Sequence, residues 1–166
     1  MEVATTYTID EIQDAIVSEF GALEGDREAM ISYIIELGEK IPLMNDAHKN
    51  ESNIIKGCVS TVWIIYKREN DKLFFEGDSN TAITKGLISI LFRVLSGREI
   101  REIVNANLYL VSKIGILNLI GPQRSSGFGN MLSQMKAMAA AEQLQLIKKK
   151  PKRKKKNANF RWPFQR

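Results

Sequence analysis

The chain has 166 residues, of which 44% are hydrophobic and 26% are charged, with a net charge of +5 and a single cysteine. This length suits one domain, which buries about 68–70% of the surface of its unfolded chain, and the ordinary composition argues against global disorder. The chain lacks an uncharged apolar run of about 18 residues, an N-terminal secretory pattern and a second cysteine, so we expect a cytoplasmic protein without membrane association or an internal disulfide.

Two amphipathic helices are predicted in the first 42 residues. The first begins with a capping box at Thr8 and Glu11, and its apolar residues follow at four-residue intervals, namely Ile12, Ile16 and Phe20. Residues 21–25, which begin and end with glycine, should break this helix. The second begins at Asp26, ends near Gly38 and Pro42, and carries on one face Met30, Ile34, Leu37 and Ile41. Both helices should pack their apolar faces on the rest of the domain.

An antiparallel hairpin is predicted after the polar loop 45–53. Residues 61–66 are rich in β-branched and aromatic side chains, residues 68–71 form a turn, and residues 73–76 form the returning strand. Both alternating sets of side chains in residues 61–66 are mostly apolar, which predicts an inner strand covered on both faces. Residues 54–56 are expected to add a short third strand.

Helical spacing returns after the hairpin and continues to residue 146. One helix is predicted over residues 83–94, ended by Gly97, and a capping box at Ser96 and Glu99 predicts another over 100–106. A short helix over 108–114 follows, and after the break at Gly121 and Pro122 a last helix runs toward residue 146. This order predicts an α+β fold in which helices flank a small antiparallel sheet of two or three strands.

The C-terminal segment differs sharply in charge from the rest of the chain. Residues 148–166 hold ten of the 24 basic residues and no acid, so residues 1–147 carry 14 basic and 19 acidic residues and a net charge of −5. Runs of like charge stay extended and commonly act as interaction tails. We therefore assign residues 1–147 to one domain and residues 148–166 to a basic, disordered tail.

Cys58 stands where a glycine-marked loop enters the first predicted strand. A lone cysteine is most often a small buried hydrophobe, and the chain offers neither a Cys-x-x-Cys pair nor a Cys-x5-Arg phosphate cradle. One cysteine and one histidine, His48, do not form a metal site, and His48 lies in a polar loop where we expect it to be solvated. Residue chemistry alone leaves packing and thiol chemistry both open for Cys58.

Four separated blocks resemble the SufE family. They lie in order over about residues 28–142, at the spacing of that family. In sequence they read Tyr33-Ile34-Ile35-Glu36-Leu37-Gly38, Gly57-Cys58-Val59-Ser60-Thr61-Val62-Trp63, Gly77-Asp78-Ser79 with Ala82-Ile83-Thr84-Lys85-Gly86-Leu87, and Gln123-Arg124-Ser125-Ser126-Gly127. The family fold, which is similar to that of the scaffold IscU, agrees with the predicted α+β order.

This resemblance implies a sulfur carrier that has no substrate turnover of its own. Members of the family accept sulfur from a SufS-type cysteine desulfurase, activate it, and pass the sulfur to an iron-sulfur scaffold that contains SufB. The pyridoxal phosphate belongs to the desulfurase, so no cofactor or metal is expected on this chain. The acceptor cysteine corresponds to Cys58, and a mobile loop around Gly57 would bury its thiol between transfers and extend it into the partner. The chain is expected to be a monomer or a homodimer.

Other residues receive roles from the same resemblance. Arg124 matches an arginine near the acceptor cysteine, where it would favour the thiolate or contact the partner, with an ordinary surface role as the alternative. Lys56, Gly57 and Asp78 are candidate partner contacts, although a capping role is favoured for Asp78. Trp63 is expected in the core.

The basic tail supports a second hypothesis, in which Cys58 is structural and the chain binds nucleic acid or the ribosome. Lysine and arginine attract phosphate, and aromatic residues stack on bases. The residues expected to act in this way are Lys150, Lys152, Arg153, Lys154 and Trp162. The alternatives for the tail are a solvated extension that aids solubility and an electrostatic tether to acidic partners.

Overall fold

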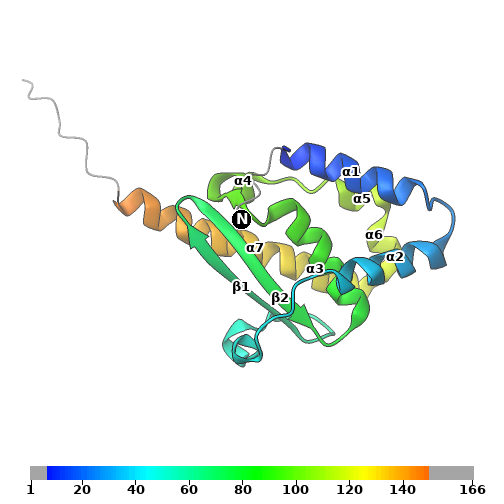
Figure 1. Ribbon diagram of the computed structural model, residues 1–166, viewed down its shortest axis with the longest axis horizontal. Helices are drawn as coiled ribbons and strands as arrows, with labels where there is room; N and C mark the ends of the chain where they lie inside the picture. Colours follow the sequence, from blue (N-terminus) through cyan, green and yellow to red (C-terminus); the bar gives the residue numbers. More distant parts are fainter. Residues whose placement is uncertain (1–6, 150–166) are drawn as a thin grey trace, which may run out of the picture.

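The computed structural model describes residues 7–149, which form seven α-helices, two short 3-10 helices and a three-stranded antiparallel sheet (Figure 1). This confirms the predicted α+β class. The elements in chain order are α1 Ile9–Gly21, α2 Arg27–Glu39, η1 Asp46–His48, η2 Glu51–Asn53, β1 Val62–Glu69, β2 Lys72–Ser79, α3 Ala82–Leu95, β3 Arg98–Glu99, α4 Ile100–Asn105, α5 Leu110–Ile114, α6 Ile116–Ile120 and α7 Pro122–Lys149.

The first two helices form as predicted. The Thr8 hydroxyl accepts a hydrogen bond from the Glu11 amide at 3.1 Å, and the Glu11 carboxylate accepts one from the Thr8 amide at 2.7 Å. The Asp26 carboxylate caps α2 by accepting from the Ala29 amide at 3.0 Å. Caps of this kind satisfy amides that lack helical partners. The apolar faces of α1 and α2 pack into the core through side chains that include Ile16, Phe20 and Ile34.

The hairpin is longer and its turn is tighter than the sequence pattern indicates. β1 and β2 pair in register from Val62 opposite Ser79 to Glu69 opposite Lys72, so only two residues remain for the turn. Asn70 adopts a φ of 56°, a left-handed conformation that asparagine tolerates in two-residue hairpin turns.

The prediction that residues 61–66 form an inner strand is wrong, because the sheet order β1-β2-β3 places β1 at an edge. The apolar side chains on both of its faces have a different cause. Val62 and Ile64 enter the core, whereas the segment with η1 and η2 packs beside Trp63, which forms an isolated bridge with Ile54 and lies 6.0 Å from the Lys49 ammonium group. Trp63 is therefore half-buried rather than part of the core.

The predicted third strand at residues 54–56 is reduced to that single bridge, and Arg98–Glu99 forms the third strand instead, pairing with β2. The capping box predicted at Ser96 is also wrong. The Ser96 hydroxyl accepts a hydrogen bond from the Phe75 amide at 2.9 Å. The residue that caps α4 is Glu99, whose amide donates to the Glu102 carboxylate at 3.0 Å. Ser96 lies between α3 and β3, and its hydroxyl bonds to an amide of strand β2 instead of capping α4.

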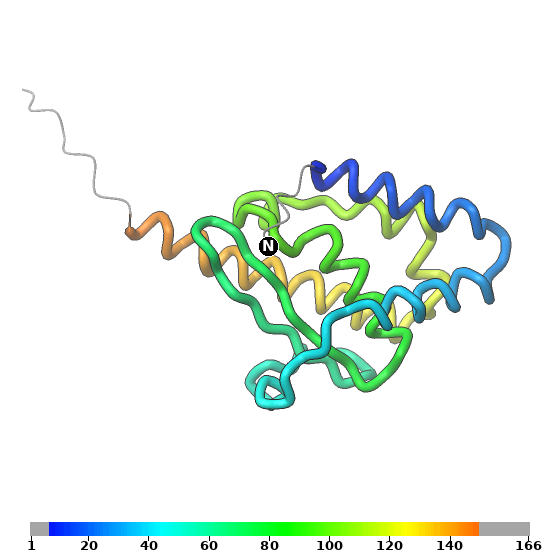
Figure 2. The backbone as a smooth tube through the Cα atoms, in the orientation of Figure 1, coloured from blue at the N-terminus to red at the C-terminus, as the bar shows by residue number. Residues whose placement is uncertain are grey.

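One long helix spans the molecule and joins its parts. α7 begins at Pro122, continues to Lys149 beyond the predicted boundary at residue 147, and runs behind the hairpin and beside α3 (Figure 2). Proline is favoured at a first helical position, where its missing amide is no loss. The shorter helices α5 and α6, of which only α5 was expected, are separated by Gly115 at a φ of 74°. A single core joins α1, α2, α3, the sheet and α7.

Candidate functional site

Cys58 lies on the loop between the bridge residue Ile54 and strand β1. Gly57, just before it, has a φ of 81°, a conformation that side chains rarely adopt, and an added Cβ atom would meet the Asn130 side-chain nitrogen. Cys58 itself is half-buried, while its neighbour Val59 is 71% exposed. The loop thus turns a thiol inward and an apolar side chain outward.

The thiol faces the first half of α7. Its Sγ atom lies 3.5 Å from the Gly127 carbonyl oxygen, to which it donates a weak hydrogen bond. Cys58 lines a hollow of about 10 Å³, about the room of one water molecule. The hollow's wall is largely apolar and includes Leu87, Phe128 and Met131.

The loop is held on both sides of Cys58. Before it, the Asn130 amide nitrogen donates to the Gly57 carbonyl oxygen at 2.9 Å. After it, the Ser60 hydroxyl lies 2.8 Å from the Thr81 hydroxyl and accepts from the Thr84 hydroxyl at 3.1 Å. These contacts join neutral groups and are each worth about 0.5–1.5 kcal/mol net. The loop is therefore positioned by polar contacts that a partner could replace.

The surroundings of Cys58 in this structure favour the protonated thiol. Burial raises the pKa of the Cys58 thiol, and no charged group among the described residues offsets this effect. The sulfur lies against the apolar side chains that line the hollow.

Arg124 and Cys58 line the same hollow. Arg124 is exposed on the first turns of α7 and forms no ion pair with any of residues 7–149. Lys56 and Gly57 are also exposed beside Cys58. The structure thus brings together four of the predicted site residues at one surface.

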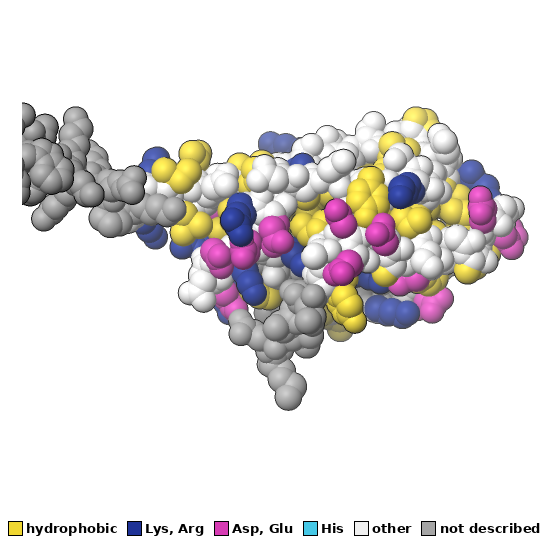
Figure 3. All heavy atoms as spheres, turned by 90° about the horizontal axis from the view of Figure 1, so that it is seen from above, with side chains coloured by type: hydrophobic (Ala, Val, Ile, Leu, Met, Phe, Trp, Pro, Cys, Tyr) yellow, Lys and Arg dark blue, Asp and Glu magenta, His cyan; other side chains and the backbone are white. Residues whose placement is uncertain are grey.

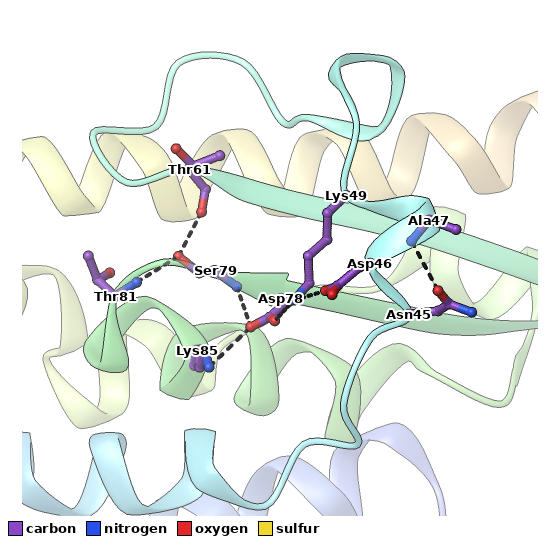
Figure 4. Close-up of polar contacts among 9 residues, drawn as sticks. All are labelled: Asn45, Asp46, Ala47, Lys49, Thr61, Asp78, Ser79, Thr81 and Lys85. Atoms are coloured by element: carbon purple, nitrogen blue, oxygen red, sulfur yellow. Dashed lines mark hydrogen bonds and ion pairs between the residues drawn. The ribbon is translucent and has the colours of Figure 1, made fainter.

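Asp78 does not line this hollow, and its carboxylate is engaged by neighbouring residues of the chain (Figure 4). Its carboxylate pairs with the Lys49 ammonium group at 2.9 Å and the Lys85 ammonium group at 3.3 Å, and accepts from the Ser79 amide at 2.7 Å. Burial would raise the pKa of Asp78, but these hydrogen bonds and charges together hold it below its ordinary value. With its side chain only 12% exposed, Asp78 ties the η1 loop, β2 and α3 together, and its role as a partner contact stays a prediction.

Neither Asn130 nor the hydroxyl cluster of Ser60, Thr81 and Thr84 was predicted as part of the site. Asn130 lies one helical turn after Gly127, so a helix beginning at Pro122 would have placed both on the face toward Cys58. The hydroxyl cluster joins a loop to the start of α3, and no local pattern signals that contact. His48 is exposed, as expected.

Several predictions concern residues that the structure does not describe. The predicted site residues that lie outside 7–149 are Lys150, Lys152, Arg153, Lys154 and Trp162.

Within residues 7–149, no helix has the length and apolar character needed to span a membrane. No three side chains of the kinds that bind metals come together in this described part of the chain.

The family is shown by comparison with known proteins. Residues 14–139 match the family described as SufE: Fe-S metabolism associated domain. An uncharacterised SufE-like protein of Rhizobium meliloti (strain 1021) is 32% identical over 131 residues, which cover 76% of this chain and 93% of that protein. A second, from Rhizobium etli, is 33% identical over 131 residues, covering 76% of this chain and 88% of its own.

A solved structure shares the fold. The solution structure of a hypothetical protein from Thermus thermophilus aligns with a TM-score of 0.66 at 15% identity, covering 80% of this chain and 96% of that one. The family match over residues 14–139, with helices around a small antiparallel sheet, identifies a domain associated with Fe–S metabolism. The chain belongs to the SufE family.

Proposed function

We propose that the chain accepts sulfur from a SufS-type, pyridoxal-phosphate-dependent cysteine desulfurase in the cytoplasm. It also activates that enzyme and passes the sulfur to a scaffold that contains SufB. Cys58 carries the sulfur as a persulfide. The observation that carries this proposal is the placement of Cys58 on a loop held by hydrogen bonds between neutral groups, with its thiol turned toward a small hollow.

Transfer is an exchange between a thiolate and a persulfide. The Cys58 thiolate attacks the terminal sulfur of a persulfide on the desulfurase, so a sulfur–sulfur bond forms at Cys58 and the one on the desulfurase breaks. The desulfurase cysteine leaves as a thiolate, and the proton lost by Cys58 passes to it or to solvent. Sulfur changes carrier without net oxidation, so this chain needs no cofactor.

The loop contacts support a change of position between the two steps. Opening the contacts to Asn130 and to the Thr81 and Thr84 hydroxyls would release Cys58 from the apolar hollow that raises the pKa of its thiol. Arg124 lines the same hollow, which supports its proposed contact with the thiolate or the partner. Return to the closed arrangement would shield the persulfide from solvent.

The proposal is tested by mixing the chain with a SufS-type desulfurase and cysteine. Intact mass should show one added sulfur atom on the wild type and none on Cys58→Ser, and only the wild type should accelerate alanine release. Cys58→Ser is close in size, so its fold should match the wild type by circular dichroism. Equal stimulation by the two proteins would contradict the proposal.

A further inference from the structure

A groove of about 640 Å³ lies at the far end of α7 from Cys58. It is formed by the hairpin turn at Asp71, the β3–α4 junction at residues 99–101, and the last turns of α7. Along α7, Ile147 is 20 residues after Gly127, which at 1.5 Å per residue corresponds to roughly 30 Å. The groove is therefore separate from the site around Cys58.

The groove has an apolar lining and a mixed polar rim. Ile100 is buried at its base, Leu146 is half-buried, and Ile147 on α7 is 61% exposed. Figure 3 shows hydrophobic side chains gathered with charged ones at the end of the molecule where α7 ends. Glu99 is paired with Arg101 at 2.7 Å, whereas Asp71 forms no ion pair with any of residues 7–149. The groove thus offers apolar surface and one available carboxylate.

One wall of the groove lies beyond the family match, which ends at residue 139. Gln143, Leu146, Ile147 and Lys149 all follow that residue, and so does the whole C-terminal segment. The wall and the chain that continues from it therefore belong to the same extension of the family domain. This favours an occupant that comes from the extension itself.

The C-terminal segment carries residues that suit the groove. Residues 160–164 read Phe160-Arg161-Trp162-Pro163-Phe164. Aromatic side chains bury large apolar areas, and Arg161 between them could pair with Asp71. Ten residues, 150–159, separate this motif from Lys149 at the groove, and at about 3.3–3.6 Å per residue they allow the chain to turn and come back.

We propose that residues 160–164 of the same chain pack into this groove, with Trp162 as the main apolar contact. The basic residues between Lys149 and Phe160 would then form a closed loop beside the end of α7. Docking covers the apolar surface that Ile147 otherwise exposes, and it leaves the surface around Cys58 open.

The experiment uses the full-length chain with Trp63→Phe, so that Trp162 is the only tryptophan. Quenching of its fluorescence by acrylamide is compared with that of a free peptide of residues 150–166. The expected quenching constant is several-fold smaller in the protein, with emission shifted to shorter wavelength. Ile147→Asp should restore quenching close to that of the peptide. Leu144→Asp should not, because Leu144 is equally exposed at 59% on α7 but does not line the groove.

Circular dichroism and urea unfolding of both aspartate variants check that the fold is retained. Quenching of Trp162 in the parent protein equal to that of the peptide would overturn the proposal, as would equal effects of the two aspartate substitutions. Shielding that disappears on dilution, together with a dimer in sedimentation, would also overturn it and assign the groove to a second copy of the chain. Shielding independent of concentration supports docking within one chain.

Discussion

At the residue scale, the thiol of Cys58 meets two opposing demands. Transfer needs a thiolate, yet burial against Leu87, Phe128 and Met131 favours the protonated form. Both are met if the thiol is protected in one loop position and ionised in another. Cys58 is half-buried in the described arrangement, and the protected and extended loop positions both stay predictions.

The pH dependence of alkylation tests this arrangement. Because the pKa of Cys58 is raised in the folded chain, its thiolate fraction near neutral pH should be smaller than that of an unfolded chain, whose thiol titrates at about 8.5. Iodoacetamide should therefore react more slowly with the folded protein, with a midpoint at higher pH than in urea. Equal midpoints in the two states would contradict the burial argument.

The same shift has a consequence for stability. The unfolded thiol ionises at lower pH than the folded one, so the packing of Cys58 contributes its full stability below the unfolded pKa. This contribution is lost as the pH rises through the raised folded pKa.

At the element scale, the Cys58 loop depends on one side chain of α7. Asn130→Ala removes the hydrogen bond to the Gly57 carbonyl and should favour the open loop. Loss of about 0.5–1.5 kcal/mol corresponds to an increase of about two- to tenfold in the open population. The rate of Cys58 alkylation should rise by the same factor.

The matched control is Gln134→Ala, an exposed position on α7 one turn further along. Its alkylation rate should equal that of the wild type, and both variants should keep the circular dichroism spectrum of the wild type. An unchanged rate in Asn130→Ala would remove Asn130 from the control of the loop.

Helices α2 and α3 approach so closely that glycine is required where they cross. A Cβ atom at Gly86 would collide with the Ile34 carbonyl oxygen, and one at Gly38 would lie 2.5 Å from the Gly86 amide nitrogen. Gly86→Ala should therefore lower the free energy of unfolding by about 1–3 kcal/mol or more, since backbone has to move. Urea unfolding measures this change.

Gly129→Ala provides the opposite result in the same experiment. Gly129 lies in α7 and no atom outside its own helix lies within 4 Å of its Cβ position, so alanine should raise stability by about 0.5–1 kcal/mol. Destabilisation by both substitutions would contradict the packing explanation, because of these two glycines Gly86 lies at the helix crossing and Gly129 does not.

At the scale of the whole molecule, α7 connects the sheet to the helical layer. Beyond the residues that match the family, the Glu142 carboxylate accepts from the Tyr66 hydroxyl at 2.9 Å and pairs with the Arg68 guanidinium at 3.0 Å. Its side chain is only 13% exposed, so water competes weakly for these contacts. The extension of α7 is thus part of the folded domain rather than an appended helix.

Glu142→Ala tests this connection. Removing the carboxylate leaves the Tyr66 hydroxyl and the Arg68 guanidinium without their partner, and the free energy of unfolding should fall by about 1–3 kcal/mol. Gln145→Ala, exposed on the same helix, should stay within about 0.5 kcal/mol of the wild type. Equal values for the two variants in urea unfolding would show that the last turns of α7 are not anchored.

Much of the fold was predictable because its signals are local. Thr8 and Glu11 mark a helix start, the β-branched and aromatic residues of 61–66 mark a strand, and the four-residue spacing from Ile83 marks a buried helix, each within a few residues. The edge position of β1 was not predictable. Trp63 and Ile65 are apolar whether a strand or a loop covers them, and the loop with η1 and η2 supplies that cover here.

By itself the sequence determined the α+β class, the order of the main elements and Cys58 as the candidate sulfur carrier, because periodicity, caps and motif blocks lie within short stretches of chain. Tertiary structure alone decided that Asn130 reaches Gly57, 73 residues away, that Ser60 meets Thr81 and Thr84, and that Arg98 rather than Ile54 extends the sheet. It also decided that a groove forms between the hairpin turn, α4 and the end of α7. Such contacts depend on how distant elements pack, and no local pattern encodes which of several compatible surfaces will meet.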